Sequence, residues 1–168
     1  MASLTCVATH VEIERKFVVD TIPDGVAWDS EQHLRQGYLA LDGATEVRVR
    51  RADGRSRLTI KHGSGLHRVE EELELDERQA DALWELTDGR RLEKRRMRTR
   101  IDGTVLELDV YEGELAGLLV AEIEFASEAA ALAFRPPPWL GHEVTHDDAY
   151  KNRALACNGA PTQEGMHR

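Results

Sequence analysis

The stretch VEIERKFVV, residues 11–19, decides how the rest of the chain is interpreted. As a β-strand it places Glu12, Glu14 and Lys16 on one face, because successive side chains of a strand point to opposite faces. Two neighbouring carboxylates repel each other unless a cation lies between them. The pattern therefore predicts a site for a hard divalent cation, with Lys16 reaching an anion bound beside it. A solvated polar face is the alternative.

The composition limits the class of protein. A chain of 168 residues is long enough for one domain with a single core. The net charge of −9 argues against a general nucleic-acid-binding protein, which needs a basic face. No apolar stretch reaches the length of a membrane span, and residues 1–10 lack a secretory pattern. Two distant cysteines fit a reducing compartment. We expect a cytoplasmic protein without nucleic-acid or membrane partners.

Seven further segments alternate like the first and favour strands. Most are joined by short turns, which make neighbouring strands antiparallel. The segments are residues 33–41, 46–51, 57–61, 68–75, 91–101, 105–111 and 118–125. Within the first of them, Gly37 indicates a bulge or a close approach of another segment.

Helices are expected after the fifth and the eighth strand. Asp76, with Gln79 three residues later, forms a capping-box pattern before a helix over residues 77–86. Trp84 in that helix is expected in the core. Ser127 begins a short alanine-rich helix that must end before the prolines at 136–138. A last helix is expected from Asp147 or Asp148 through residue 156.

The charged side chains of the strands share the face of the first glutamates. Carboxylate pairs occur at Glu70/Glu72, Glu107/Asp109 and Glu122/Glu124, and the cations are Lys16, Arg48, Arg50, Lys61, Lys94 and Arg96. Eight antiparallel strands can close into a barrel. We therefore predict an α+β, mainly β fold: an eight-stranded antiparallel closed β-barrel with a charged lumen, and an apolar exterior under flanking helices. It forms a single domain over residues 1–168, with its core at 11–156 and loose tails at 1–10 and 159–168.

In this order, the motifs resemble the CYTH superfamily, also called triphosphate tunnel metalloenzymes. Its E-x-E-x-K signature matches Glu12, Glu14 and Lys16. The likeness continues through R-x-R, T-x-K, E-x-E, E-K-x-R, E-x-D and E-x-E to Tyr150-Lys151-Asn152. It is greatest to the short bacterial single-domain members, several of which hydrolyse inorganic tripolyphosphate.

The resemblance implies a role for each charged group. The implied ligands of Mg²⁺ or Mn²⁺ are Glu12, Glu14, Glu122, Glu124 and Asp109. The implied substrate-binding residues are Lys16, Arg48, Arg50, Lys61, Lys94, Arg96 and Lys151. The implied catalytic residues are Glu12, Glu14, Lys94 and Tyr38. Three roles stay open for a further set of carboxylates: binding a second metal, orienting the basic residues and positioning water. These carboxylates are Glu70, Glu72, Glu107 and Asp109.

The implied function is metal-dependent hydrolysis of triphosphate phosphoanhydride bonds, with inorganic tripolyphosphate giving pyrophosphate and phosphate. A class IV-type adenylyl cyclase or a thiamine triphosphatase is the second hypothesis, although an aromatic content of 5% offers little for stacking an organic group. A non-catalytic polyphosphate- or nucleotide-binding module is the third, and the retained carboxylates argue against it. The expected partner is a small-molecule triphosphate, and a homodimer is left open.

Overall fold

The computed structural model describes residues 13–63 and 69–161. In this part of the chain, eight strands form one antiparallel sheet in the order β1-β8-β7-β6-β2-β3-β4-β5. The predicted mainly β, α+β class is confirmed, and every expected strand is present. The strands are β1 (Ile13–Val18), β2 (Ser30–Asp42), β3 (Thr45–Ala52), β4 (Arg55–His62), β5 (Val69–Leu75), β6 (Arg91–Ile101), β7 (Thr104–Glu112) and β8 (Leu119–Phe125).

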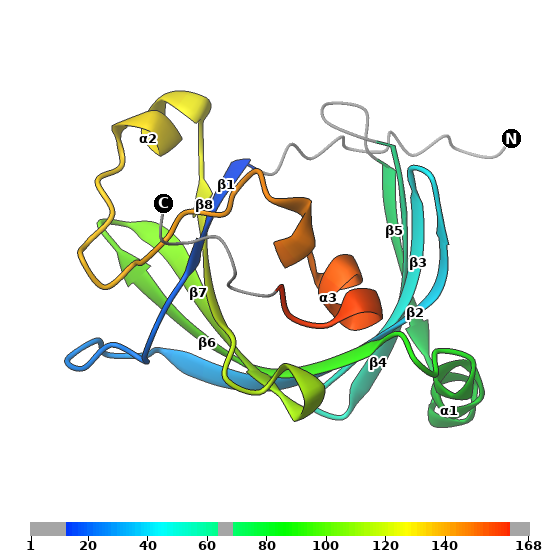
Figure 1. The fold of residues 1–168 in the computed structure, drawn as a ribbon. Coiled ribbons are helices and arrows are strands. Elements are labelled where there is room, and N and C mark those ends of the chain that lie inside the picture. Colours follow the sequence, from blue (N-terminus) through cyan, green and yellow to red (C-terminus); the bar gives the residue numbers. More distant parts are fainter. Residues whose placement is uncertain (1–12, 64–68, 162–168) are drawn as a thin grey trace, which may run out of the picture.

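The sheet is strongly curved, and its edge strands β1 and β5 stand on opposite sides of the concave face (Figure 1). Residues 142–144 occupy the free edge of β1. The Val18 amide donates to the His142 carbonyl and the Val144 amide to the Lys16 carbonyl, each at 2.8 Å. Within the described ranges β1 and β5 are not paired, so the closed barrel stays a prediction.

The alternation of the strands directs the predicted charged site residues to the concave face and the larger apolar core to the convex face. Phe17, Leu106, Leu108 and Ile123 are almost fully buried in the convex core. Helix α2 (Glu128–Ala133) packs on β1 and β8, and Ser127 caps it as predicted. The helices cover only part of the convex face, however, because Leu73 on β5 is 53% exposed.

Helix α1 (Glu77–Glu85) lies on the convex side (Figure 1). It begins with the predicted capping box: the Asp76 carboxylate accepts from the Gln79 amide at 2.7 Å, and the Gln79 side chain accepts from the Asp76 amide at 3.0 Å. The predicted core residue Trp84 is buried. Three guanidinium groups lie over its ring at 4.8 to 5.4 Å, from Arg35, Arg51 and Arg91.

The C-terminal segment lies inside the curve of the sheet (Figure 1). The expected last helix is divided, because Lys151 has an extended backbone between η2 (Asp148–Tyr150) and α3 (Asn152–Asn158). A further turn, η1 (Gly113–Leu115), precedes β8. An inner apolar cluster holds α3 against the sheet; it includes Tyr38, Leu92, Tyr111, Val120, Leu155 and Ala156. Among the described residues, no helix combines the length and the apolar character that crossing a bilayer requires.

Candidate active site

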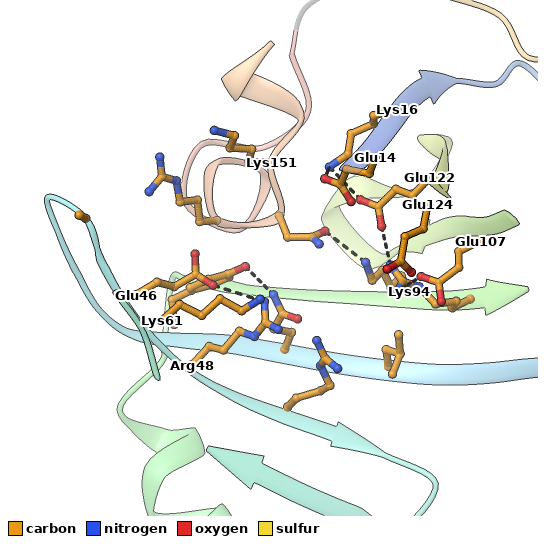
Figure 2. A pocket seen from close by; sticks show the side chains of 18 of the residues that line it. Glu14, Lys16, Glu46, Arg48, Lys61, Lys94, Glu107, Glu122, Glu124 and Lys151 are labelled. Carbon is orange, nitrogen blue, oxygen red and sulfur yellow. Dashed lines mark hydrogen bonds and ion pairs between the residues drawn. The ribbon is translucent and has the colours of Figure 1, made fainter. Parts of the chain in front are cut away.

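A cavity of about 710 Å³ lies between the concave face of the sheet and α3. The predicted site residues in its lining are Glu14, Lys16, Tyr38, Arg48, Arg50, Lys61, Lys94, Arg96, Glu107, Glu122, Glu124 and Lys151. Figure 2 shows four carboxylates on one side, with Lys16 and Lys94 among them; they are Glu14, Glu107, Glu122 and Glu124. Arg48 and Lys61 lie on the other side, with Glu46 beside them. Three predicted residues, Glu70, Glu72 and Asp109, pair with basic residues without lining the cavity. Glu12 lies outside the described residues.

Carboxylates from three adjacent strands form what we call the acidic wall: Glu14 on β1, Glu107 on β7, and Glu122 and Glu124 on β8. Glu14 lies directly opposite Glu124 in the strand register. Glu107 lies directly opposite Glu122. Like charges in such pairs destabilise a sheet, so the wall favours a cation. Carboxylate oxygens are the ligands that Mg²⁺ and Mn²⁺ prefer, and the residues present therefore fit such an ion.

Two members of the acidic wall form close ion pairs: Glu107 with Arg96 and Arg98, and Glu122 with two cations. Glu122 accepts from Lys16 Nζ at 2.8 Å and from Arg96 Nη2 at 3.0 Å. Burial alone would raise the pKa of the Glu122 carboxyl. Lys16, Arg96 and Lys94 outweigh burial and hold that pKa far below its ordinary 4.5. Burial likewise opposes the charge on Lys16, but Glu122 and Glu14 raise the pKa of its ammonium.

Lys94 and Asp109 form a buried ion pair beside the acidic wall. Lys94 Nζ lies 2.5 Å from Asp109 Oδ2. Arg96 donates to the same carboxylate through Nε and Nη2, both at 2.6 Å. Since both Asp109 oxygens accept from basic side chains, the geometry favours orientation of those side chains, and the metal-ligand role of Asp109 stays a prediction. Burial lowers the pKa of the Lys94 ammonium to about 8, against the opposing effect of Asp109.

The opposite, basic wall consists of Arg48 and Arg50 on β3 and Lys61 on β4. Lys61 Nζ pairs with Glu70 at 2.9 Å. The Nε atoms of Arg48 and Arg50 are buried without a hydrogen-bond partner among the described residues. Burial, followed by the charges of Arg48 and Arg96, lowers the pKa of the Arg50 guanidinium. Buried donors and crowded positive charge make this wall receptive to an anion.

Tyr38 stands beside the basic wall as a neutral hydrogen-bonding group. Its hydroxyl accepts from Gln36 Nε2 at 2.5 Å. Burial, supported by Glu46, raises the pKa of Tyr38 well above its ordinary 10.0. The hydroxyl therefore keeps its proton at neutral pH.

Sequence reasoning missed four polar residues in the lining: Gln36, Glu46, Asn152 and Arg153. The strand alternation could have identified Gln36 and Glu46, because they lie on the same strand faces as Tyr38 and Arg48. Asn152 was noted only as part of a family motif, and Arg153 had no signal in the alternation. The tertiary fold alone brings α3 to the cavity.

A separate group of metal-capable side chains lies on the convex face, outside the cavity. Ligand atoms of His33, Glu93 and Glu112 lie within 4.8 Å of one another. His33 Nε2 is 2.9 Å from Glu112, and Arg35 pairs with Glu93 at 2.7 Å. These three residues were not predicted as a site.

Comparisons with known proteins assign the family. The model of the CYTH domain matches residues 10–135. The chain belongs to the CYTH family. This membership confirms the resemblance drawn from the E-x-E-x-K signature and from the paired charges of the later strands.

Two curated relatives and one solved structure match nearly the whole chain. The inorganic triphosphatase of Nitrosomonas europaea is 49% identical over 152 residues, which cover 88% of this chain and 97% of that protein. The inorganic triphosphatase of Acetivibrio thermocellus is 37% identical over 154 residues, covering 88% and 94%. A crystal structure of an inorganic triphosphatase superposes with a TM-score of 0.74 at 44% identity, and covers 90% of this chain and 98% of that one.

Proposed function

We propose that this CYTH protein is an inorganic triphosphatase that hydrolyses tripolyphosphate to pyrophosphate and phosphate. The observation that carries the proposal is one cavity with an acidic wall facing a basic wall. A polyanion bound together with a divalent cation satisfies both walls at once. The similar proteins named inorganic triphosphatase support the same reaction.

The acidic wall is the proposed metal site. Glu14, Glu122 and Glu124 would hold Mg²⁺ or Mn²⁺, and Glu12 is a further ligand from the strand pattern. When bound there, the cation neutralises negative charge on the phosphate oxygens. Metal dependence is general to CYTH proteins. Ion pairs to Lys16 and Arg96 keep Glu122 ionised, and so preserve its charge for the cation.

The basic side chains bind and orient the triphosphate. Arg48 and Arg50 can bind phosphate oxygens bidentately, whereas Lys61 acts as a point charge. Lys94 contacts the phosphoryl group that is transferred. Together these cations stabilise the charge that builds on the leaving pyrophosphate, which is the main requirement of phosphoryl transfer. Closure of the sheet into a full barrel around the anion belongs to the same proposal.

Residues outside the two walls complete the proposed site. Lys151 binds the end of the anion that lies nearest α3. Glu70 and Glu72 orient basic residues of β4, since Glu70 pairs with Lys61 and Glu72 pairs with Arg57 at 3.0 Å. The single domain, the cytoplasmic location, the homodimer and the lack of nucleic-acid and membrane partners stay predictions.

An adenylyl cyclase or a thiamine triphosphatase would need a surface on which an organic group can stack. Tyr38 is the only aromatic residue in the described lining, and its side chain is 1% exposed. The cavity therefore favours an inorganic substrate.

Phosphate release from tripolyphosphate, ATP and thiamine triphosphate tests the proposal. Each substrate is supplied with Mg²⁺, with Mn²⁺ or with a chelator. We expect fast release from tripolyphosphate that the chelator abolishes. A higher kcat/KM on ATP or thiamine triphosphate would instead support an adenylyl cyclase or a thiamine triphosphatase. No turnover on any substrate would support a non-catalytic binding module.

Glu14→Gln should reduce metal-dependent turnover by about 100-fold, because the acidic wall loses a charged ligand. The fold should persist, since the Glu14 side chain is half exposed. Steady-state kinetics with Mg²⁺ or Mn²⁺ measure the effect. Glu112→Gln, which alters the metal-capable group on the convex face, is the matched control and should keep its activity. Equal losses of activity in the two variants would contradict a metal site at the acidic wall of the cavity.

A further inference from the structure

Asn152, at the start of α3, contacts two buried side chains of the sheet. Its Oδ1 accepts from the Tyr111 hydroxyl at 2.6 Å and from Lys94 Nζ at 3.2 Å. Both partners are donors at neutral pH, so the carboxamide presents its oxygen to the sheet. Burial raises the pKa of Tyr111 well above 10.0 and keeps the hydroxyl protonated.

The contact with Asn152 restricts the orientation of Lys94. An ammonium group has three N–H donors. Asp109 accepts one at 2.5 Å and Asn152 accepts another, which leaves one for a phosphate oxygen. The Tyr111 ring lies 5.3 Å from Nζ and limits the remaining space. Without Asn152, a single hydrogen bond to Asp109 would leave the ammonium free to rotate.

Asn152 also connects Lys94 to the packing of α3. Leu155 and Ala156 are buried in the inner apolar cluster that includes Tyr38 and Tyr111. This packing places the start of α3 at the cavity, and the Asn152 oxygen gives it a polar attachment to β6 and β7. The position of α3 and the orientation of Lys94 therefore depend on the same carboxamide.

We propose that Asn152 is a positioning residue, whose carboxamide oxygen fastens α3 to the sheet and aims Lys94 at the substrate. The inference rests on the proposed function, in which Lys94 contacts the transferred phosphoryl group. It adds a role that the charged motifs do not contain, because Asn152 is neutral and acts through another residue.

Three variants separate positioning from simple packing. Asn152→Leu keeps the approximate volume and removes the acceptor. Asn152→Asp keeps the acceptor and adds a negative charge beside the cavity. Asn158→Leu makes the same exchange at the exposed end of the same helix and is the control. The measurements are kcat and KM on tripolyphosphate with Mg²⁺, and hydrogen–deuterium exchange of residues 152–158.

The two Asn152 variants should differ in kcat. We expect Asn152→Leu to lose about 100-fold in kcat, because a misplaced catalytic group costs that order of rate. Asn152→Asp should keep kcat within about 3-fold, since Lys94 retains its acceptor, while KM rises about 10-fold through charge repulsion. Asn158→Leu should match the wild type. Wild-type kcat in Asn152→Leu, or equal kcat losses in both Asn152 variants, would overturn the positioning role.

Hydrogen exchange keeps this test separate from that of the proposed function. Exchange of residues 152–158 should quicken in Asn152→Leu and stay slow in Asn152→Asp. If the wild type does not hydrolyse tripolyphosphate, the proposed function fails, and exchange still decides whether Asn152 fastens α3. Unchanged exchange in Asn152→Leu would show that apolar packing alone holds the helix, and the inference would be wrong.

Discussion

Glu122 shows how single residues of the cavity depend on their partners. Its side chain is 15% exposed, and the cations Lys16 and Arg96 hold its pKa well below 4.5. A depressed carboxyl pKa stabilises the folded state fully above the unfolded pKa. That stabilisation is lost as the pH falls toward the folded pKa. Lowering the pH from neutrality to about 3 should therefore cost the wild type about 2 kcal/mol of stability, nearly all of it below pH 4.5, that Glu122→Gln has already lost. Urea unfolding at a series of pH values measures this loss in the free energy of unfolding. Glu85→Gln, at an exposed position, is the control. A parallel decline of Glu122→Gln and the wild type would contradict the ion-pair account.

At the scale of elements, Thr87, which follows α1, packs directly on β2, and this contact requires a glycine at position 37. A Cβ added at Gly37 would lie 2.4 Å from Thr87 Oγ1 and 2.7 Å from Thr87 Cβ. Because Thr87 is fully buried, it has little room to move. Gly37→Ala should therefore destabilise the protein by about 1–3 kcal/mol, as overpacking does. Thermal unfolding measures the loss, and Ser30→Ala at the exposed start of β2 should leave the melting temperature unchanged. A wild-type melting curve for Gly37→Ala would show that α1 is not seated this closely.

For the whole molecule, the two facing walls link stability to ligand binding. Glu14 and Glu124 oppose each other on one wall, and Arg48 and Arg50 crowd the other. Mg²⁺ with imidotriphosphate, an analogue that resists hydrolysis, should relieve both repulsions. At about 100 times the dissociation constant, linkage adds about 2.7 kcal/mol to stability. Differential scanning calorimetry should show a rise of about 5–10 °C. Mg²⁺ with sulfate at equal ionic strength is the control, and an equal rise with sulfate would exclude a specific polyanion site.

The local patterns of the chain predicted much of the fold and most of the cavity lining. Alternation in β1 and β8 predicted the shared face of Glu14, Lys16 and Glu122, because a strand has a side-chain period of two. The capping box at Asp76 predicted the start of α1 for a similarly local reason. The pairing of residues 142–144 with the edge of β1 was not predicted, since that segment has no strand pattern and its partner is distant in sequence.

The sequence by itself determined which side chains face each way along each strand, and hence that carboxylates and cations share one face of the sheet. Only the tertiary structure decided which of them remain available to a ligand. Asp109 and Glu107 have the same strand parity, and both pair with arginines. Asp109 is nevertheless fully buried and also bonded to Lys94, whereas Glu107 lines the cavity. Strand parity is a local property of the backbone. Burial and pairing depend on the curvature of the sheet and on the position of α3, and these arise from contacts between residues far apart in the chain.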